Sequence, residues 1–164
     1  MPTMATWSEV VTAAPELAAR VRERFDAYGL ALLATLRRDG SPRISPIEPL
    51  FAMDELWLGM MPDSRKATDL VRDARFALHS ATSDKQVTNG DAKLSGVAIP
   101  VVQQSDLEHY ARAFEAATGY SPGSGPFTLF RANVQEVSFL MPAGDHLDIS
   151  WWREGSGIRT VERR

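Results

Sequence analysis

The chain contains 164 residues with a formal net charge of −3, and 44% of them are hydrophobic against 24% charged, a balance typical of one folded globular domain rather than of a disordered chain. The acidic balance argues against a general nucleic-acid-binding protein, because neutralising a phosphate backbone requires a basic surface. Cysteine is absent, which excludes disulfides, thiolate metal sites and cysteine nucleophiles and favours a cytoplasmic location.

The first part of the chain predicts one helix followed by an antiparallel meander. We expect residues 1–14 to be flexible or loosely packed. A helix is expected from Pro15 to Tyr28, because proline suits a first helical turn and Gly29 suits the position just past the end. Short apolar runs bounded by turns then predict three strands, at residues 30–36, 43–50 and 55–61. Consecutive strands joined by tight turns argue against a parallel sheet built from βαβ units.

The second part of the chain predicts two more helices and four strands. One helix covers residues 64–73 and can be capped by Asp63 or Ser64, and another begins at Ser105, where Ser105 and Glu108 match a capping box. The four strands are expected at residues 75–81, 91–101, 127–140 and 147–153. Six to seven mostly antiparallel strands with peripheral helices predict a mainly β fold, a split β-barrel in one domain over residues 1–164.

Ser64, Arg65 and Lys66 place a hydroxyl and two cations at the start of a predicted helix. Free backbone N–H groups and the positive end of the helix dipole point to the same place, so a phosphate monoester could gain charge-assisted hydrogen bonds there. Arg43 and Ser45 point to one side of an earlier strand, and Arg43 could converge on the same anion. From these residues alone, a capped surface helix with solvated cations remains the alternative interpretation.

Two runs of sequence carry a resemblance to a known family: ATLRRDGSPRISPIEP at residues 34–49 and ELWLGMMPDSRKATDLVRDARFALHS at residues 55–80. Their order of elements resembles the pyridoxamine 5′-phosphate oxidase-like superfamily of flavin-binding split barrels. The resemblance implies a cofactor phosphate bound by Arg43, Ser64, Arg65 and Lys66. It also implies an isoalloxazine ring lined by the backbone of Ile44, Ser45, Pro46, Gly59 and Met60 and approached by Trp152.

The same resemblance implies FMN as the cofactor, a small-molecule substrate, and a homodimer with cofactor sites at the subunit interface. Two features depart from the family. Glu48 stands where the oxidases carry a lysine that reaches the flavin, which indicates an 8-hydroxy-5-deazaflavin cofactor as the alternative to FMN. Residues 158–164 lack the Arg-x-His pair that contacts the substrate in the oxidases, so pyridoxamine phosphate is not the expected substrate.

We therefore predict a cytoplasmic oxidoreductase that moves a hydride to or from a small organic molecule. The cofactor would carry the reactive atom, so no side chain is predicted to be catalytic. No nucleic-acid partner is expected, and no membrane partner, since no apolar run approaches the ~18 residues of a membrane helix. His146 and Asp148 are too few ligands to predict a metal site. Two alternatives remain open: a non-catalytic flavin- or ligand-binding protein, and a haem-handling split barrel.

Overall fold

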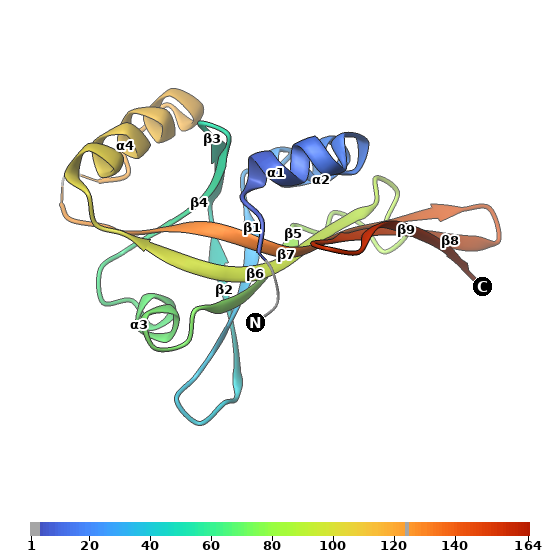
Figure 1. The fold of residues 1–164 in the computed structure, drawn as a ribbon, viewed down its shortest axis with the longest axis horizontal. Coiled ribbons are helices and arrows are strands. Elements are labelled where there is room, and N and C mark those ends of the chain that lie inside the picture. The colour runs from blue at the N-terminus through green and yellow to red at the C-terminus, as the bar shows by residue number, and fades with distance from the viewer. Residues whose placement is uncertain (1–3, 124) are drawn as a thin grey trace.

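Nine strands form one branched sheet in the computed structural model, which describes residues 4–123 and 125–164 (Figure 1). The strands are β1 (Ala31–Leu36), β2 (Pro42–Ile47), β3 (Pro49–Ala52), β4 (Glu55–Met60), β5 (Arg75–Ser80), β6 (Asp91–Val101), β7 (Thr128–Ala143), β8 (His146–Arg153) and β9 (Gly157–Arg163). The main path runs β2-β1-β5-β6-β7-β4-β3, and β8 and β9 branch from β7. Each of these pairings is antiparallel.

The long strand β7 is where the sheet divides. Its residues from Thr128 to Arg131 pair with β4, whereas those from Glu136 to Ala143 pair with β8. The strands β2 and β3 lie at the two ends of the main path and do not pair with each other, so the barrel stays open between β2 and β4. The predicted mainly β, antiparallel split barrel is confirmed.

Two details of the strand prediction differ from the structure. The strand expected over residues 43–50 is divided into β2 and β3 at Glu48, where Pro49 lacks the N–H that a continuing ladder needs. β9 was not predicted, because all of its residues are exposed and its sequence therefore carries no alternating apolar pattern. These two changes account for nine strands in place of six or seven.

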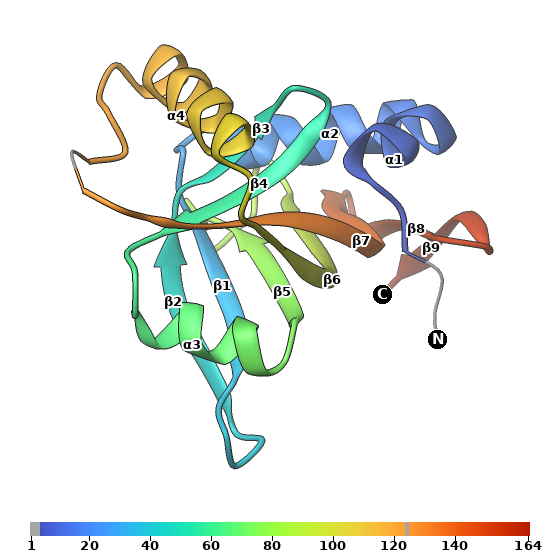
Figure 2. The same cartoon turned by 60° about the vertical axis from the view of Figure 1, so that its left-hand side comes forward.

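Four helices flank the sheet: α1 (Trp7–Ala13), α2 (Pro15–Asp26), α3 (Arg65–Arg72) and α4 (Gln104–Thr118). Figures 1 and 2 show α1, α2 and α4 on one side of β7 and α3 on the other. The larger apolar core lies between α1, α2 and the sheet, and a smaller cluster around Tyr110 and Phe114 packs α4 against β3 and β4. In the described ranges, every helix is too short or too polar to span a lipid bilayer.

Residues 4–14 are well packed, which corrects the prediction that segment 1–14 is flexible or loosely packed. Thr6 and Glu9 form a capping box at the start of α1, with Glu9 Oε2 accepting from the Thr6 backbone N–H at 2.7 Å. Trp7 and Val10 are buried, and Ala5 forms a bridge to β7. Burial of this apolar surface holds the segment against the sheet. Residues 1–3 of the predicted segment lie outside the described residues.

The two predicted helix caps have different outcomes. Ser64 caps α3 as expected, with its Oγ accepting from the backbone N–H of Ala67 at 3.3 Å. The Ser105 capping box is wrong: α4 already begins at Gln104, and its N-cap residue, Gln103, makes no side-chain cap hydrogen bond. Ser105 lies inside the first turn, where it cannot act as the N-cap.

Candidate functional site

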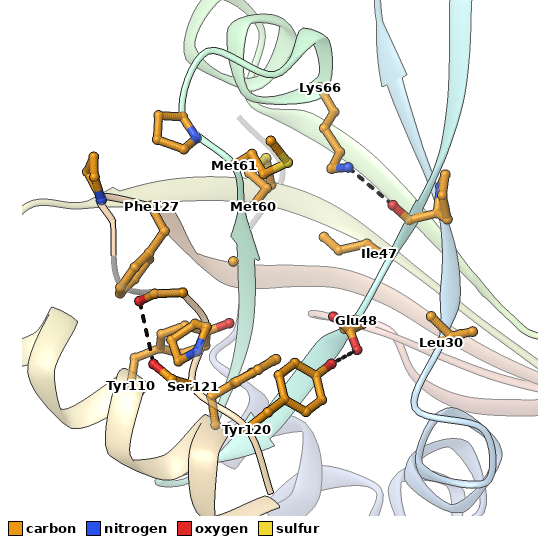
Figure 3. Close-up of a pocket in the computed structure, with 17 residues that line it drawn as sticks. Leu30, Ile47, Glu48, Met60, Met61, Lys66, Tyr110, Tyr120, Ser121 and Phe127 are labelled. Carbon is orange, nitrogen blue, oxygen red and sulfur yellow. Dashed lines mark hydrogen bonds between the residues drawn. The ribbon is translucent and has the colours of Figure 1, made fainter. Parts of the chain in front are cut away.

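A cavity of about 460 Å³ lies where the barrel stays open, between the ends of β2 and β4 (Figure 3). One side is lined by Pro46, Ile47 and Glu48, and the other by Gly59, Met60 and Met61. Lys66, from the first turn of α3, lies at one end. Leu30, just before β1, and α4 with the residues that follow it supply the remaining wall, so segments far apart in the sequence build this cavity.

The strand edges that face the cavity leave backbone groups unpaired. β3 pairs with β4 only as far as Leu58, the partner of Pro49, so among the described strands nothing continues the ladder past Gly59 and Met60 on that side. β2 is an end strand, and its outer edge is open as well. Such edges offer N–H and C=O groups to a ligand. One of them is already used, because Lys66 Nζ donates to the carbonyl of Pro46 at 3.2 Å.

Asp69, a buried residue of α3, joins the helix to the sheet beside this cavity. Its Oδ2 accepts from Arg43 Nε at 2.7 Å and from Thr35 Oγ1 at 2.9 Å, and its Oδ1 accepts from Arg72 Nη2 at 3.2 Å. Burial alone would raise the pKa of Asp69, but hydrogen bonds from Arg43, Thr35 and Arg72 more than offset burial and lower this pKa. One carboxylate between two guanidinium groups leaves this corner positively charged.

The start of α3 adds further positive charge to the same corner. Ser64 is the N-cap, Arg65 is exposed and Lys66 is half-buried. The backbone N–H groups of the first turn have no intrahelical acceptor, and the helix dipole is positive at this end. With Arg43 held one turn further along the helix by Asp69, the corner suits an anion such as a phosphate group.

Tyr110 forms one wall of the cavity by packing on Gly59. A Cβ atom at position 59 would lie 2.1 Å from the Tyr110 hydroxyl oxygen, so the close approach requires glycine. The Tyr110 ring also packs against those of Trp57, Phe114 and Phe127, at centroid distances of 6.3, 5.8 and 5.5 Å. Burial raises the pKa of Tyr110, with smaller contributions from the charges of Glu48 and Tyr120, so this hydroxyl stays protonated near neutral pH.

Glu48 and Tyr120 meet at the end of the cavity away from Lys66. The Tyr120 hydroxyl donates a hydrogen bond to Glu48 Oε1 (Figure 3). This bond is the main reason why the pKa of Tyr120 is raised, with burial and the charge of Glu48 adding to it. The contact fastens the segment that follows α4 to the junction of β2 and β3.

The outer face of the sheet carries a second hollow, of about 420 Å³. Leu32, His79, Lys93 and Ser138 lie directly opposite one another across β1, β5, β6 and β7 and therefore point to this face. Ile44 from β2 also lines the hollow, with 71% of its surface exposed. Leu32 and Ile44 form an exposed apolar patch on this face, beside its polar residues, and such a patch is typical of an interaction surface.

His79 is one of the residues that line this second hollow. Its Nδ1 lies 2.7 Å from the carbonyl oxygen of Ser80; because a carbonyl only accepts, Nδ1 carries the proton. In the neutral ring Nε2 is then unprotonated. The carboxylate of Asp91 is 3.9 Å from that nitrogen.

His146, Asp148 and Glu162 form a separate polar group on the β8–β9 hairpin, with their ligand-type atoms all within 4.8 Å of one another. His146 Nε2 is 3.2 Å from Asp148 Oδ1, and Nδ1 is 3.1 Å from Asp145 Oδ1. Hydrogen bonding to Asp145 is the main cause that raises the pKa of His146, opposed by desolvation and aided by Glu162 and Asp148. This group is therefore described best as a histidine surrounded by carboxylates that favour its protonated form.

The structure brings only part of the predicted site together. Four predicted residues line the cavity: Pro46, Gly59, Met60 and Lys66. Arg43, Ser64 and Arg65 flank it along β2 and α3. Ser45 lies opposite the buried Leu33, whereas Ile44 points to the second hollow instead.

Trp152 was predicted to approach the cofactor ring, and for a single chain this prediction is wrong, because Trp152 does not line the cavity. Trp152 is 3% exposed and belongs to the main core, because it lies opposite the buried Val137. Trp151 points the other way, opposite Ser138. Tyr110 and Tyr120 were not predicted as site residues, although the aromatic series Tyr110, Phe114, Tyr120 and Phe127 was visible in the sequence as a signal.

Comparison with known proteins agrees with this architecture. A sequence model of the family described as pyridoxamine 5′-phosphate oxidase matches residues 17–141, whereas no curated protein matches the chain. Among solved structures, a conserved hypothetical protein from Mycobacterium tuberculosis has a TM-score of 0.63 at 19% identity, covering 73% of this chain and 81% of its own.

Two further solved structures are similar over more of the chain. PhzG from Burkholderia lata, in complex with tetrahydrophenazine-1-carboxylic acid, has a TM-score of 0.58 at 19% identity over 92% of this chain and 87% of its own. A heme binding protein from Mycobacterium smegmatis has a TM-score of 0.58 at 15% identity over 88% and 87%. At these identities the similarity shows the fold alone.

Proposed function

The chain belongs to the pyridoxamine 5′-phosphate oxidase family, and from this premise we propose that it is an oxidoreductase that binds FMN, or an 8-hydroxy-5-deazaflavin cofactor, at the opening between β2 and β4. The observation that carries the proposal is the cavity itself. It combines open strand edges, apolar walls and a positively charged corner in one place.

The positively charged corner suits the cofactor phosphate. Ser64, Arg65 and Lys66 would hold it from the start of α3, and Arg43 would hold it from β2. Arg43 uses Nε for Asp69, which leaves its two terminal nitrogens to form a pair of parallel hydrogen bonds with a phosphate. Asp69 would thus orient Arg43 without cancelling the charge of the corner, because Arg72 shares the same carboxylate.

The middle of the cavity suits a flat ring system. Ile47 and Met60 offer apolar surface, while the open edges at Pro46 and Gly59 offer backbone groups to ring heteroatoms. When bound, the flavin supplies the atom that accepts or gives the hydride. The chain's own contribution is to bind and orient the ring and to exclude water from it, with Tyr110 covering one wall.

We further propose that the protein is a homodimer in which a second copy covers the outer hollow. Leu32 and Ile44 are exposed there, and burying them would remove apolar surface from water. A partner on this face would also lie next to β2, the strand that carries Arg43, so that cofactor sites would be near the subunit interface.

Cofactor titration tests the proposed function. FMN and the deazaflavin are each added to the purified protein while cofactor fluorescence is followed, and at least one is expected to bind with micromolar or better affinity. Combining Arg43→Ala with Lys66→Ala removes two charge-assisted contacts of about 1.5–3 kcal/mol each, so affinity should fall by about two orders of magnitude or more.

The matched control combines Arg38→Ala with Lys85→Ala, which removes the same charges from two exposed loops. Lys66→Ala alone serves as a second variant that leaves the Arg43–Asp69 contact intact. Failure of both cofactors to bind, or unchanged affinity in the Arg43 and Lys66 variants, contradicts the proposal. Stopped-flow reduction of the bound cofactor by candidate donors then separates an enzyme from a flavin-binding protein without turnover.

One observation favours haem handling as the second candidate function. His79 lines the outer hollow and its Nδ1 lies 2.7 Å from the carbonyl oxygen of Ser80, so the neutral ring would have Nε2 available to bind haem iron. A visible spectrum taken during titration with haemin distinguishes the two candidates. If haem is the ligand, the spectrum should show a haem-bound form that is lost in His79→Ala but kept in His109→Ala, whose histidine lies on α4.

A further inference from the structure

The cavity between β2 and β4 has ends of opposite charge. Among its described lining residues, Glu48 is the single carboxylate and Lys66 the single cation. Figure 3 shows Lys66 beside Met60 at one end and Glu48 beside Tyr120 at the other. The side chains between the two ends, such as Ile47 and Met60, are apolar. A molecule that fills the cavity therefore contacts a positively charged end, an apolar middle and a negatively charged end.

The negative end is also aromatic. The rings of Tyr110, Phe114 and Tyr120 line the cavity here, and those of Phe114 and Tyr120 contact each other edge to face at 5.4 Å. Tyr120 donates to Glu48 Oε1, while Oε2 has no protein hydrogen-bond partner within the described part of the chain. A carboxylate oxygen accepts charge-assisted hydrogen bonds from an ammonium group, and aromatic ring faces attract the same cation.

We propose that Glu48, together with the rings of Tyr110 and Tyr120, forms a subsite for a protonated amine, and that the substrate is an apolar molecule carrying such a group. The subsite rests on the proposed function only for the identity of the molecule beside it, the flavin held at the Lys66 end. Glu48 attracts the ammonium group, so the charged end of the substrate lies at the Glu48 end of the cavity and its apolar part faces the ring held at Ile47 and Met60. A neutral or anionic molecule of the same shape lacks this attraction.

Three probes of similar shape test the subsite: 1-naphthylmethylamine, 1-naphthylmethanol and 1-naphthylacetate. Their affinities are measured by calorimetry for the full chain, with and without FMN. The amine is expected to bind about tenfold more tightly than the alcohol, and the carboxylate most weakly. The preference should decrease at high salt, since Glu48 is exposed and its charge is screened.

Variants at position 48 show whether Glu48 is the cause. Glu48→Gln should bind the amine and the alcohol equally, whereas Glu48→Lys should reverse the order and favour 1-naphthylacetate, a gain that an unfolded protein cannot give. Glu154→Gln, a matched change at the turn between β8 and β9, should keep the amine preference. Equal affinity of the unmutated protein for amine and alcohol, or a preference that survives in Glu48→Gln, overturns the subsite.

FMN titration of the same samples separates this inference from the proposed function. FMN binding without any amine preference overturns the subsite alone. An amine preference that disappears in Glu48→Gln, in a protein that binds neither FMN nor the deazaflavin, supports the subsite and contradicts the flavin proposal.

Discussion

Arg43 of β2 and Asp69 of α3 are joined by a hydrogen-bonded ion pair, with Nε 2.7 Å from Oδ2. The arginine expected to grip a cofactor is therefore held in place by a carboxylate of the protein itself. Thr35 and Arg72 donate to the same carboxylate, so a single buried group links β1, β2 and α3. The shape of the charged corner depends on Asp69 as much as on the cations around it.

Asp69→Asn should destabilise the fold. The neutral amide weakens three hydrogen bonds, and hydrogen bonds to a buried charged group are worth about 1.5–3 kcal/mol each, so the free energy of unfolding should fall by about 2 kcal/mol or more in a urea titration. Asp73→Asn is the control, since Asp73 pairs with the exposed Arg75, and exposed pairs contribute little. Equal effects of the two variants would contradict the role assigned to Asp69.

The contribution of Asp69 to the free energy of unfolding should also depend on pH. The pKa of Asp69 is lowered in the folded state, so its contribution is present above the ordinary aspartate value of about 3.9 and is lost as the pH falls through the lower folded value. Acid unfolding of Asp69→Asn should therefore be less steep than that of the unmutated protein. Asp73, whose pKa is lowered to about 2, remains in both proteins and cancels in the comparison.

Local signals explain which parts of the site could be predicted. The cap of α3 could be narrowed to Asp63 or Ser64 because the N-cap preference depends on a few consecutive residues, and the Arg43 and Lys66 charges are visible in the sequence. The Asp69 contact was not predicted, because it joins residues 26 positions apart through the packing of α3 on the sheet. The same limit applies to Tyr110 and Gly59, whose contact depends on how α4 lies on β4.

A second limit of the sequence is that one pattern can occur at two positions and have the expected structure at only one of them. Thr6 to Glu9 and Ser105 to Glu108 both match a capping box, yet only the first forms one. Trp151 and Trp152 are neighbours on one strand and therefore point to opposite faces. The sequence does not show which of them is buried, because a one-residue change of register exchanges the two faces. The partner residue Val137, which is buried opposite Trp152, decides this in the folded protein.

Gly59→Ala should disturb both stability and the cavity. The new methyl group would overlap the Tyr110 hydroxyl, and the surrounding aromatic rings keep Tyr110 from moving aside. Overpacking of this kind costs about 1–3 kcal/mol, measurable by thermal or urea unfolding. Gly125→Ala is the matched control, because a Cβ atom there has no neighbour within 4 Å. A stability loss no larger than in the control would mean that Tyr110 is free to move.

Ile44→Lys should prevent the proposed dimer without unfolding the protein. Ile44 is 71% exposed in one chain, so a lysine costs little there, but a charge within an apolar interface is strongly unfavourable. Sedimentation velocity should show a dimer for the unmutated protein and a monomer for the variant. Val102→Lys changes a residue that is 78% exposed outside the outer hollow and should leave the dimer intact. A dimer that persists in Ile44→Lys would place the interface elsewhere.

His146 should make the β8–β9 hairpin more stable in mildly acidic solution. Its carboxylate neighbours, Asp145, Asp148 and Glu162, raise the pKa of its imidazole above the ordinary value of about 6.5, although Arg164 partly compensates Asp145. The stabilisation is therefore complete below the unfolded pKa and is lost as the pH rises through the higher folded pKa. An NMR titration of the His146 ring should give this raised value directly, and Glu162→Gln should lower it toward the ordinary one. A value at or below that of His109, which lies exposed on α4, would show that these carboxylates do not act on His146 in solution.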